Sequence, residues 1–173
     1  MRRESERNQY LPLMTYIIAD YAYRYHWGFL IGPKEEMSEA VRGRRCHVKN
    51  RPLQGWVYDD VKIENVRNST QLLVRIVIAK VEDEKRLRSL LREVPIVQDS
   101  PDWRCRTWVA NALRILKADS KALGTSMLDW RKIEMTAREY VAKKVAQGRF
   151  ATSEDLMQPK PTWDLINNEE VVS

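Results

Sequence analysis

The sequence predicts an α+β fold, in which an antiparallel sheet of about five or six strands carries a helix packed on one face, followed by a long C-terminal helix. Segments rich in β-branched and aromatic residues fill the first half of the chain, and segments with apolar residues at helical spacing fill the second. With 173 residues, 43% of them hydrophobic, the chain can form one domain around its own core. We expect this domain to span residues 1–150 and to be followed by an acidic tail, residues 151–173.

Strands are expected where β-favouring segments end at Gly, Pro or charged residues. Segment 71–81 has apolar residues on both sides of its alternation, which indicates that both of its faces are covered. The charged segment 34–45 is expected to be an exposed loop, and the proline within residues 94–98 makes that segment a candidate edge strand. The other expected strands are 13–22, 25–31, 46–50 and 55–60.

Three helices are expected in the second half of the chain. Asp83 suits the N-cap of the first, and Gly148 supplies the stop of the last. The Ser-Pro-Asp sequence at 100–102 has the composition of a helix start, which would place Cys105 in the first turn or so of the middle helix. The expected helices are 84–93, 101 to about 117, and 127–147.

Charge is distributed unevenly along the chain. Residues 151–173 hold one base and five acids, so the tail carries −4; the chain as a whole carries +6, which leaves 29 bases and 19 acids, or +10, in residues 1–150. A body this basic favours anionic partners such as RNA, anionic lipid or phosphorylated small molecules. The alternative is a solvated basic surface that the acidic tail partly offsets.

Several classes of protein do not fit the sequence. No apolar run is long enough for a membrane span, no secretory signal precedes the first strand, and two cysteines make no disulfide framework, so we expect a cytoplasmic protein. No glycine-rich phosphate loop supports nucleotide hydrolysis. The set His26, Cys46, His47 and Cys105 lacks metal-ligand spacing, so no metal and no cofactor are expected.

Cys105 and His26 together suggest thiol chemistry. A cysteine at a helix start can have its thiol pKa lowered from about 8.5 into the neutral range, and an imidazole can take its proton. A third polar group would have to orient that imidazole; His47 is one candidate and could also act as the base itself, and Asp59 and Asp60 are other candidates for the orienting role. The alternative is that the cysteine is a small buried hydrophobic residue and that the histidines only pack.

The predicted substrate-binding residues surround these groups in the sequence. A basic run beside His47 would hold an anionic head group or the acceptor end of an RNA, although as a solvated loop it needs no function. Two tryptophans neighbour the predicted catalytic residues. The residues expected to bind substrate are Arg42, Arg44, Arg45, Lys49, Trp27 and Trp103.

The motif His-Trp-Gly-Phe-Leu-Ile-Gly at 26–32, the later His47 and Cys105 at a helix start resemble the permuted papain-like clan, which includes the NlpC-type peptidases and the lecithin:retinol acyltransferase family. The Trp-x-Cys-x-x-Trp-Val segment at 103–109 is also similar to uncharacterised fungal proteins. The resemblance covers roughly residues 13–117. Two features depart from the clan's pattern: Arg104 replaces the usual asparagine before the cysteine, and 21 residues separate the two histidines, more than is usual.

The resemblance implies Cys105 as nucleophile, His26 as general base and His47 as the polar third member. We therefore expect a cysteine-dependent hydrolase or acyltransferase that forms a covalent acyl-enzyme. One alternative is an acyltransferase or amide-bond-forming enzyme that uses a carrier-bound donor, aminoacyl-tRNA or phospholipid, on its basic surface. Another is a non-catalytic module of the same fold that binds anions or RNA.

Overall fold

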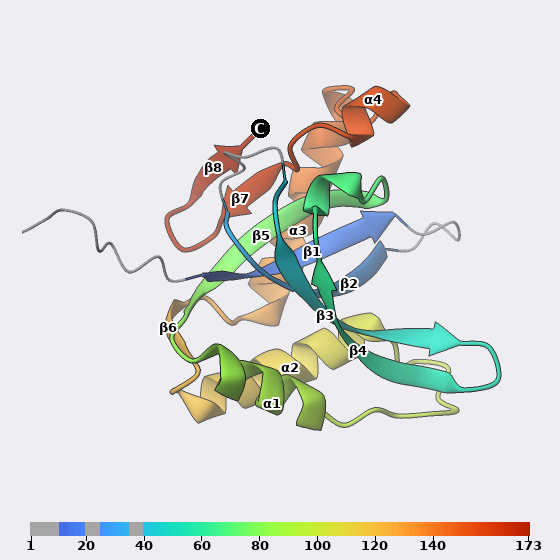
Figure 1. Cartoon of the computed structure of the whole chain (residues 1–173), viewed down its shortest axis with the longest axis vertical. Coiled ribbons are helices and arrows are strands. Elements are labelled where there is room, and N and C mark those ends of the chain that lie inside the picture. Colours follow the sequence, from blue (N-terminus) through green and yellow to red (C-terminus); the bar gives the residue numbers. More distant parts are fainter. Residues whose placement is uncertain (1–10, 20–24, 35–39) are drawn as a thin grey trace, which may run out of the picture.

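The computed structural model describes residues 11–19, 25–34 and 40–173, and it has the expected α+β architecture (Figure 1). The first half forms β1 (Pro12–Ala19), β2 (Tyr25–Ile31), β3 (Gly43–Arg51), β4 (Gly55–Ile63), the short 3₁₀ turn η1 (Val66–Asn68) and β5 (Leu72–Val81). The second half forms α1 (Glu84–Glu93), α2 (Cys105–Asp119), β6 (Leu123–Ser126), α3 (Trp130–Ala146), α4 (Ser153–Leu156), β7 (Thr162–Asp164) and β8 (Glu169–Val172).

The strands form one sheet of eight, in the order β4-β3-β2-β1-β5-β7-β8, with β6 pairing to β5. The sheet is mixed, because β7 runs parallel to β5 while the other pairs are antiparallel. The prediction of a purely antiparallel sheet with five or six strands is therefore wrong in these two details. The three additional strands are three or four residues long, too short to show a period of two in the sequence.

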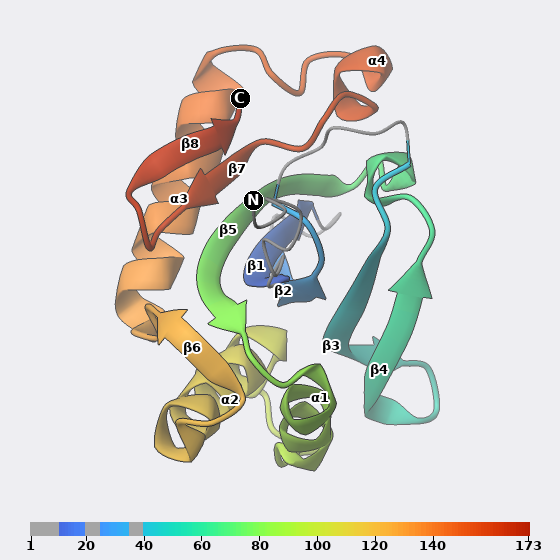
Figure 2. The ribbon, with the colours of Figure 1, turned by 60° about the vertical axis from the view of Figure 1, so that its left-hand side comes forward.

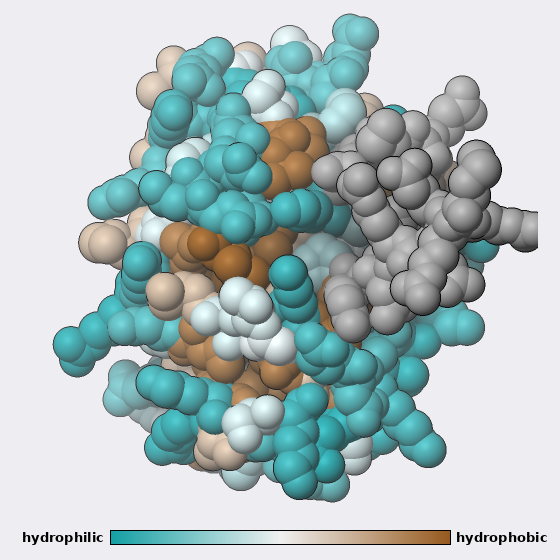
Figure 3. Space-filling view, turned by 90° about the vertical axis from the view of Figure 1, so that its left-hand side faces the viewer, coloured by the Kyte–Doolittle hydropathy of each residue, from teal (hydrophilic) through white to brown (hydrophobic). Residues whose placement is uncertain are grey.

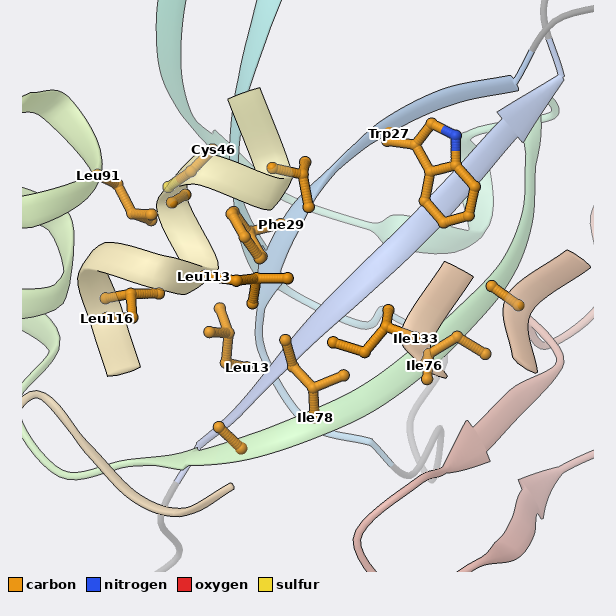
Figure 4. Close-up of a cluster of buried hydrophobic side chains, with 14 of the residues drawn as sticks. Leu13, Trp27, Phe29, Cys46, Ile76, Ile78, Leu91, Leu113, Leu116 and Ile133 are labelled. Carbon is orange, nitrogen blue, oxygen red and sulfur yellow. The ribbon is translucent and has the colours of Figure 1, made fainter. Parts of the chain in front are cut away.

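Helices cover one face of the sheet. The helix α2 packs on β2 and β3 beside α1, and α3 runs along β5 (Figures 1 and 2). The core between them includes Phe29 and Cys46 from the strands and Leu113 and Leu116 from α2 (Figure 4). Met14, Tyr16 and Leu30 belong to a second, smaller cluster of buried residues. Both faces of the central strands are thus covered, as expected for β5.

Most predicted boundaries agree with the structure. β2 spans the predicted residues, and Asp83 caps α1 by accepting a hydrogen bond from the backbone N–H of Arg86 at 2.9 Å. β1 ends at Ala19; the predicted continuation to 22 lies outside the described residues, as does part of the predicted loop, residues 35–39. Residues 43–45, which were predicted to belong to this loop, are the first residues of β3.

Two local predictions are wrong. Residues 94–98 form no strand, and residues 101–102 form a turn before α2 instead of its first residues. The helix α2 therefore begins after this turn, with Cys105 as its first residue.

Residues 151–173 are not a tail but part of the fold. Lys160, Thr162 and Asp164 are buried, and β7 adds to the sheet beside β5. The buried Arg75 of β5 donates from Nε to Oγ1 of Thr162 at 2.9 Å. The acidic composition of the segment obscured this role, since three of its five buried residues are polar or charged and only Pro161 and Leu165 are apolar.

The face of the molecule shown in Figure 3 is largely hydrophilic. On the face shown in Figure 3, hydrophobic side chains reach the surface in patches framed by hydrophilic ones, as is usual for folded proteins. Over the described ranges, no helix combines the length and apolar character that crossing a membrane requires.

Candidate functional site

Cys105 occupies the N1 position of α2, with Arg104 as the N-cap residue. The side-chain oxygen of Thr107 accepts a hydrogen bond from the backbone N–H of Arg104 at 3.3 Å, which secures the first turn. The cysteine is 6% exposed. Its thiol therefore lies beside backbone N–H groups of the first turn, where the helix dipole stabilises negative charge. The prediction that Cys105 lies at a helix start is confirmed.

His26 and His47 form a pair. Nε2 of His26 lies 2.7 Å from Nδ1 of His47, and the two rings meet edge to face with centroids 5.0 Å apart. On the far side of this pair, Nε2 of His47 lies 3.4 Å from a carboxylate oxygen of Asp59. The structure thus joins His26, His47 and Asp59 into one chain of polar groups.

The register of β3 and β4 explains why Asp59 and not Asp60 takes this position. His47 lies directly opposite Asp59, whereas Cys46 lies opposite Asp60. Since neighbouring residues of a strand point to opposite faces, Asp60 faces away from the histidines. It pairs instead with Arg44 and with Arg88 of α1, whose Nε lies 2.9 Å away.

The surroundings of His47 favour one pair of tautomers for the two histidines. Burial, reinforced by repulsion from His26 and Arg45, lowers the pKa of His47 to about 3, so this imidazole is neutral near pH 7. The pKa of Asp59 is lowered foremost by its hydrogen bond with Lys49, so Asp59 is a carboxylate. A carboxylate 3.4 Å from Nε2 favours the His47 tautomer with its proton on that nitrogen, although this contact does not have hydrogen-bond geometry, and Nδ1 of His47 can then accept the Nε2–H of His26. Nδ1 is thereby the basic nitrogen of His26.

The pKa of His47 predicts a pH dependence of stability. In the unfolded chain this histidine binds a proton below about pH 6.5, whereas in the folded protein it stays neutral down to about pH 3. The free energy of unfolding should therefore fall as the pH drops through this window, by up to about 1.4 kcal/mol per pH unit from this one group. In His47→Asn the slope should be smaller, which urea unfolding between about pH 4.5 and 6.5 would measure. Equal slopes in parent and variant would contradict a neutral, buried His47.

Gly28 allows a tyrosine to approach this pair. Tyr16 of β1 lies opposite Gly28, and a Cβ at position 28 would lie 2.8 Å from Cβ of His47 and closer still to the Tyr16 hydroxyl. The ring of Tyr16 lies 6.4 Å from that of His26. Among the described residues its buried hydroxyl has no hydrogen-bond partner. No local sequence pattern identifies the tyrosine that lies over Gly28.

The ionisation of Tyr16 is sensitive to its burial and to nearby charge, including charge on Cys105. Burial raises the pKa of Tyr16; Arg45 opposes this shift, and negative charge on Cys105 would add to it. The thiol is thus near enough to the Tyr16 hydroxyl for its charge to act there. Burial therefore keeps this hydroxyl protonated at neutral pH.

The thiol and the imidazoles lie near the end of β2 where β3 separates from it. β2 pairs with β3 from Phe29 to Ile31 only, and beyond Cys46 the strand β3 pairs with β4 alone. Tyr25 and Trp27, which flank His26 in β2, line a cavity of about 420 Å³ with Cys105. Strand alternation directs His26 to the other side of β2 from these two aromatic residues. Cys105 and His26 therefore border the same stretch of β2 from its two sides.

The predicted basic residues do not gather at this cavity. Because 43–51 is a strand, Arg44 and Arg45 point to opposite faces: Arg44 pairs with Asp60, and Arg45 borders Tyr16. Arg42 pairs with Glu64 at 3.5 Å and Lys49 with Asp59 at 2.7 Å, and none of the four lines the cavity. The expectation that they form one basic rim around Cys105 is wrong.

The tryptophans predicted at the site have different positions. Trp27 lines the cavity at Cys105, as proposed for a substrate-binding residue. Trp103 is buried against Trp56, with ring centroids 5.4 Å apart, and contributes to packing.

Other cations lie at the cavity. Arg104, Arg106 and Arg138 are among its lining residues, and Arg138 lies over the rings of Tyr25 and Trp27 at 5.6 and 5.5 Å. Arg104 and Arg106 flank the cysteine in the sequence and could have been noticed there. No sequence signal identifies Arg138, because α3 is brought to β2 only by tertiary packing.

Comparison with known proteins gives one family. No curated protein and no solved structure matches the chain. Within the described residues, no group of three or more His, Cys, Asp or Glu side chains is placed to hold a metal ion. A family model matches residues 10–172, from before β1 to the end of β8, so it includes the candidate site and the C-terminal strands. The chain therefore belongs to the family of unknown function DUF6914.

Proposed function

We propose that this protein is a thiol enzyme of the permuted papain-like type that transfers acyl groups through a covalent intermediate on Cys105. The observation that carries the proposal is the polar chain of His26, His47 and Asp59 at the stretch of β2 that Cys105 borders. In this proposal His26 moves the proton, and His47 and Asp59 hold its ring in the required tautomer. The resemblance of these motifs to the clan supports the same assignment.

Because Cys105 and His26 border β2 from its two sides, the first step in this proposal passes the Cys105 proton to Nδ1 of His26 through a bridging water at the end of β2, where β3 no longer pairs with it. The thiolate then attacks the carbonyl carbon of an ester, thioester or amide, and the carbonyl oxygen becomes an oxyanion. Backbone N–H groups in the first turn of α2 are suited to stabilise that oxyanion. His26 returns its proton to the leaving group as the carbon–heteroatom bond breaks, which leaves the acyl group on sulfur. Water or a second substrate, deprotonated by His26, then takes the acyl group and restores the thiol.

The second cysteine is a natural internal control. Cys46 lies in the core on the opposite face of β3 from His47. Burial raises the pKa of its thiol to about 12, so it stays protonated and unreactive at neutral pH. The proposed chemistry is thus specific to one of the two thiols.

The cations at the cavity favour a charged acyl donor over a neutral ester. Such a donor would be a charged small molecule or an acyl group bound to a carrier such as RNA or anionic lipid. A binding module without catalysis is the alternative of a different class. It would bind anions in a salt-dependent way and would retain that binding after loss of Cys105.

Trapping of the acyl-enzyme tests the proposal. With p-nitrophenyl acetate as the probe, peptide mass spectrometry should find one acetyl group on Cys105 shortly after mixing. The Cys46→Ser variant should acetylate like the parent, and Cys105→Ala should show no acetylated cysteine. Slow and equal acetylation of Cys46 and Cys105 would overturn the proposal.

A further inference from the structure

The cavity beside Cys105 has the properties of a ligand site. Its volume of about 420 Å³ lies in the range of small-molecule pockets. One wall is aromatic, formed by Tyr25 and Trp27, and the guanidinium of Arg138 lies over both rings. The thiol and the start of α2 form another part of the lining.

The charges around this cavity do not cancel. Glu134 of α3 accepts hydrogen bonds from both Arg106 and Arg138, at 2.6 and 3.0 Å, so one carboxylate serves two guanidinium groups. Asp102 is the carboxylate among the lining residues, and it is exposed. Arg104 forms no ion pair with any residue that the structure describes. Three arginines thus face two carboxylates, in addition to the positive end of α2.

We infer that this cavity binds the anionic group, a carboxylate or a phosphate, of the acyl donor, and that Arg104 is its main ligand. The inference rests on the proposed function, since it names the class of donor that Cys105 would use. Arg104 and Cys105 line the same cavity, so a donor whose anionic group binds the Arg104 guanidinium would have its acyl group in the cavity with the thiol. Glu134 holds Arg106 and Arg138 in place, which leaves Arg104 as the guanidinium that can pair with an incoming anion.

The site therefore fits a small donor with a short apolar or planar arm between its anionic group and its acyl group. The arm would lie against Tyr25 and Trp27, and the anion would lie at Arg104. A neutral ester would gain only the aromatic contact. We therefore expect the selectivity for charged over neutral donors to depend on Arg104.

Alkylation of Cys105 by a charged and a neutral reagent tests this inference without knowledge of the substrate. In a Cys46→Ser background, the rates of reaction with iodoacetate and with iodoacetamide are compared by peptide mass spectrometry. Both reagents alkylate the same sulfur with loss of iodide, but only iodoacetate carries a carboxylate. We expect Arg104→Gln to lower the iodoacetate-to-iodoacetamide rate ratio about tenfold, the loss of roughly one charge-assisted contact. Arg104→Lys should keep part of the ratio.

Arg114→Gln provides the matched control, because Arg114 is exposed on the same helix and does not line the cavity. Its rate ratio should equal that of the parent. Competition by acetate or by inorganic phosphate distinguishes the two anion chemistries, since the preferred one slows the iodoacetate reaction more. If Arg104→Gln slows both reagents equally, Arg104 only stabilises the thiolate, and the inference is wrong.

Thermal unfolding separates failure of this inference from failure of the proposed function. Inorganic phosphate or acetate should raise the melting temperature of the Cys105→Ala protein, and the rise should be lost when Arg104→Gln is added. A Cys105 that reacts with neither reagent would overturn the proposed function alone. An anion-dependent rise that is the same with and without Arg104 would overturn the subsite.

Discussion

Replacing His26 with alanine is expected to lower the rate of acyl transfer to p-nitrophenyl acetate by about 10³-fold. Without the imidazole, nothing takes the Cys105 proton at neutral pH or returns it to the leaving group. The loss should shrink as the pH approaches the pKa of a free thiol, about 8.5, because the thiolate then forms without a base. Rates measured from pH 6 to about 9 test both parts.

The same rate measurement tests how His47 and Asp59 act on His26. His47→Asn keeps an acceptor beside His26 but removes the contact with Asp59, so we expect a smaller loss, on the order of tenfold. The double variant should be no slower than His26→Ala, because His47 acts only through His26. Additive losses would mean that His47 acts on substrate or thiol directly. Full activity in His26→Ala would remove this residue from the mechanism.

Trp108→Ala is expected to lower the free energy of unfolding by about 3–5 kcal/mol. The side chain is fully buried in α2, with its ring 5.7 Å from that of Phe29 in β2 and 5.8 Å from that of Tyr58 in β4. Its removal leaves a cavity at the contact that holds the helix of Cys105 against the strands of the histidines. Acyl transfer should therefore weaken at temperatures where the variant is still folded.

Two further variants make this prediction specific. Trp108→Phe keeps most of the packing and removes an indole N–H that is buried without a hydrogen-bond partner in the described structure, so its cost should be below about 1.5 kcal/mol. Arg114→Ala, at an exposed position of the same helix, should change stability by no more than about 0.5 kcal/mol. Urea unfolding of the three variants and the parent measures all of these differences. A loss below about 1 kcal/mol in Trp108→Ala would show that α2 is held by other contacts.

Part of the candidate site was predictable because it depends on local patterns. β2 was predicted at its observed bounds, since a β-favouring composition and the Gly32-Pro33 stop are properties of adjacent residues. A helix start near Cys105 was predicted for the same kind of reason, although the Ser-Pro-Asp sequence proved to be a turn before the helix and not its cap.

The choice among the candidate third groups was not predictable in this way. Asp59 and Asp60 are equivalent in sequence, and only the pairing of β3 with β4 places one of them opposite His47. A shift of one residue in that register would exchange the two carboxylates. The same holds for the predicted basic rim, which strand alternation and ion pairs divide between two faces.

The sequence by itself determined the fold class, a strand for each of the two histidines and the cysteine at a helix start, because composition, turn residues and helix termini act over a few adjacent residues. Only the tertiary structure decided which groups contact one another. It forms the hydrogen bond between His26 and His47 and places Tyr16 over Gly28. It also packs Arg138 of α3 against β2 and adds the short strand β7 beside β5. These contacts join residues far apart in the chain, and they depend on register and packing that no local pattern specifies.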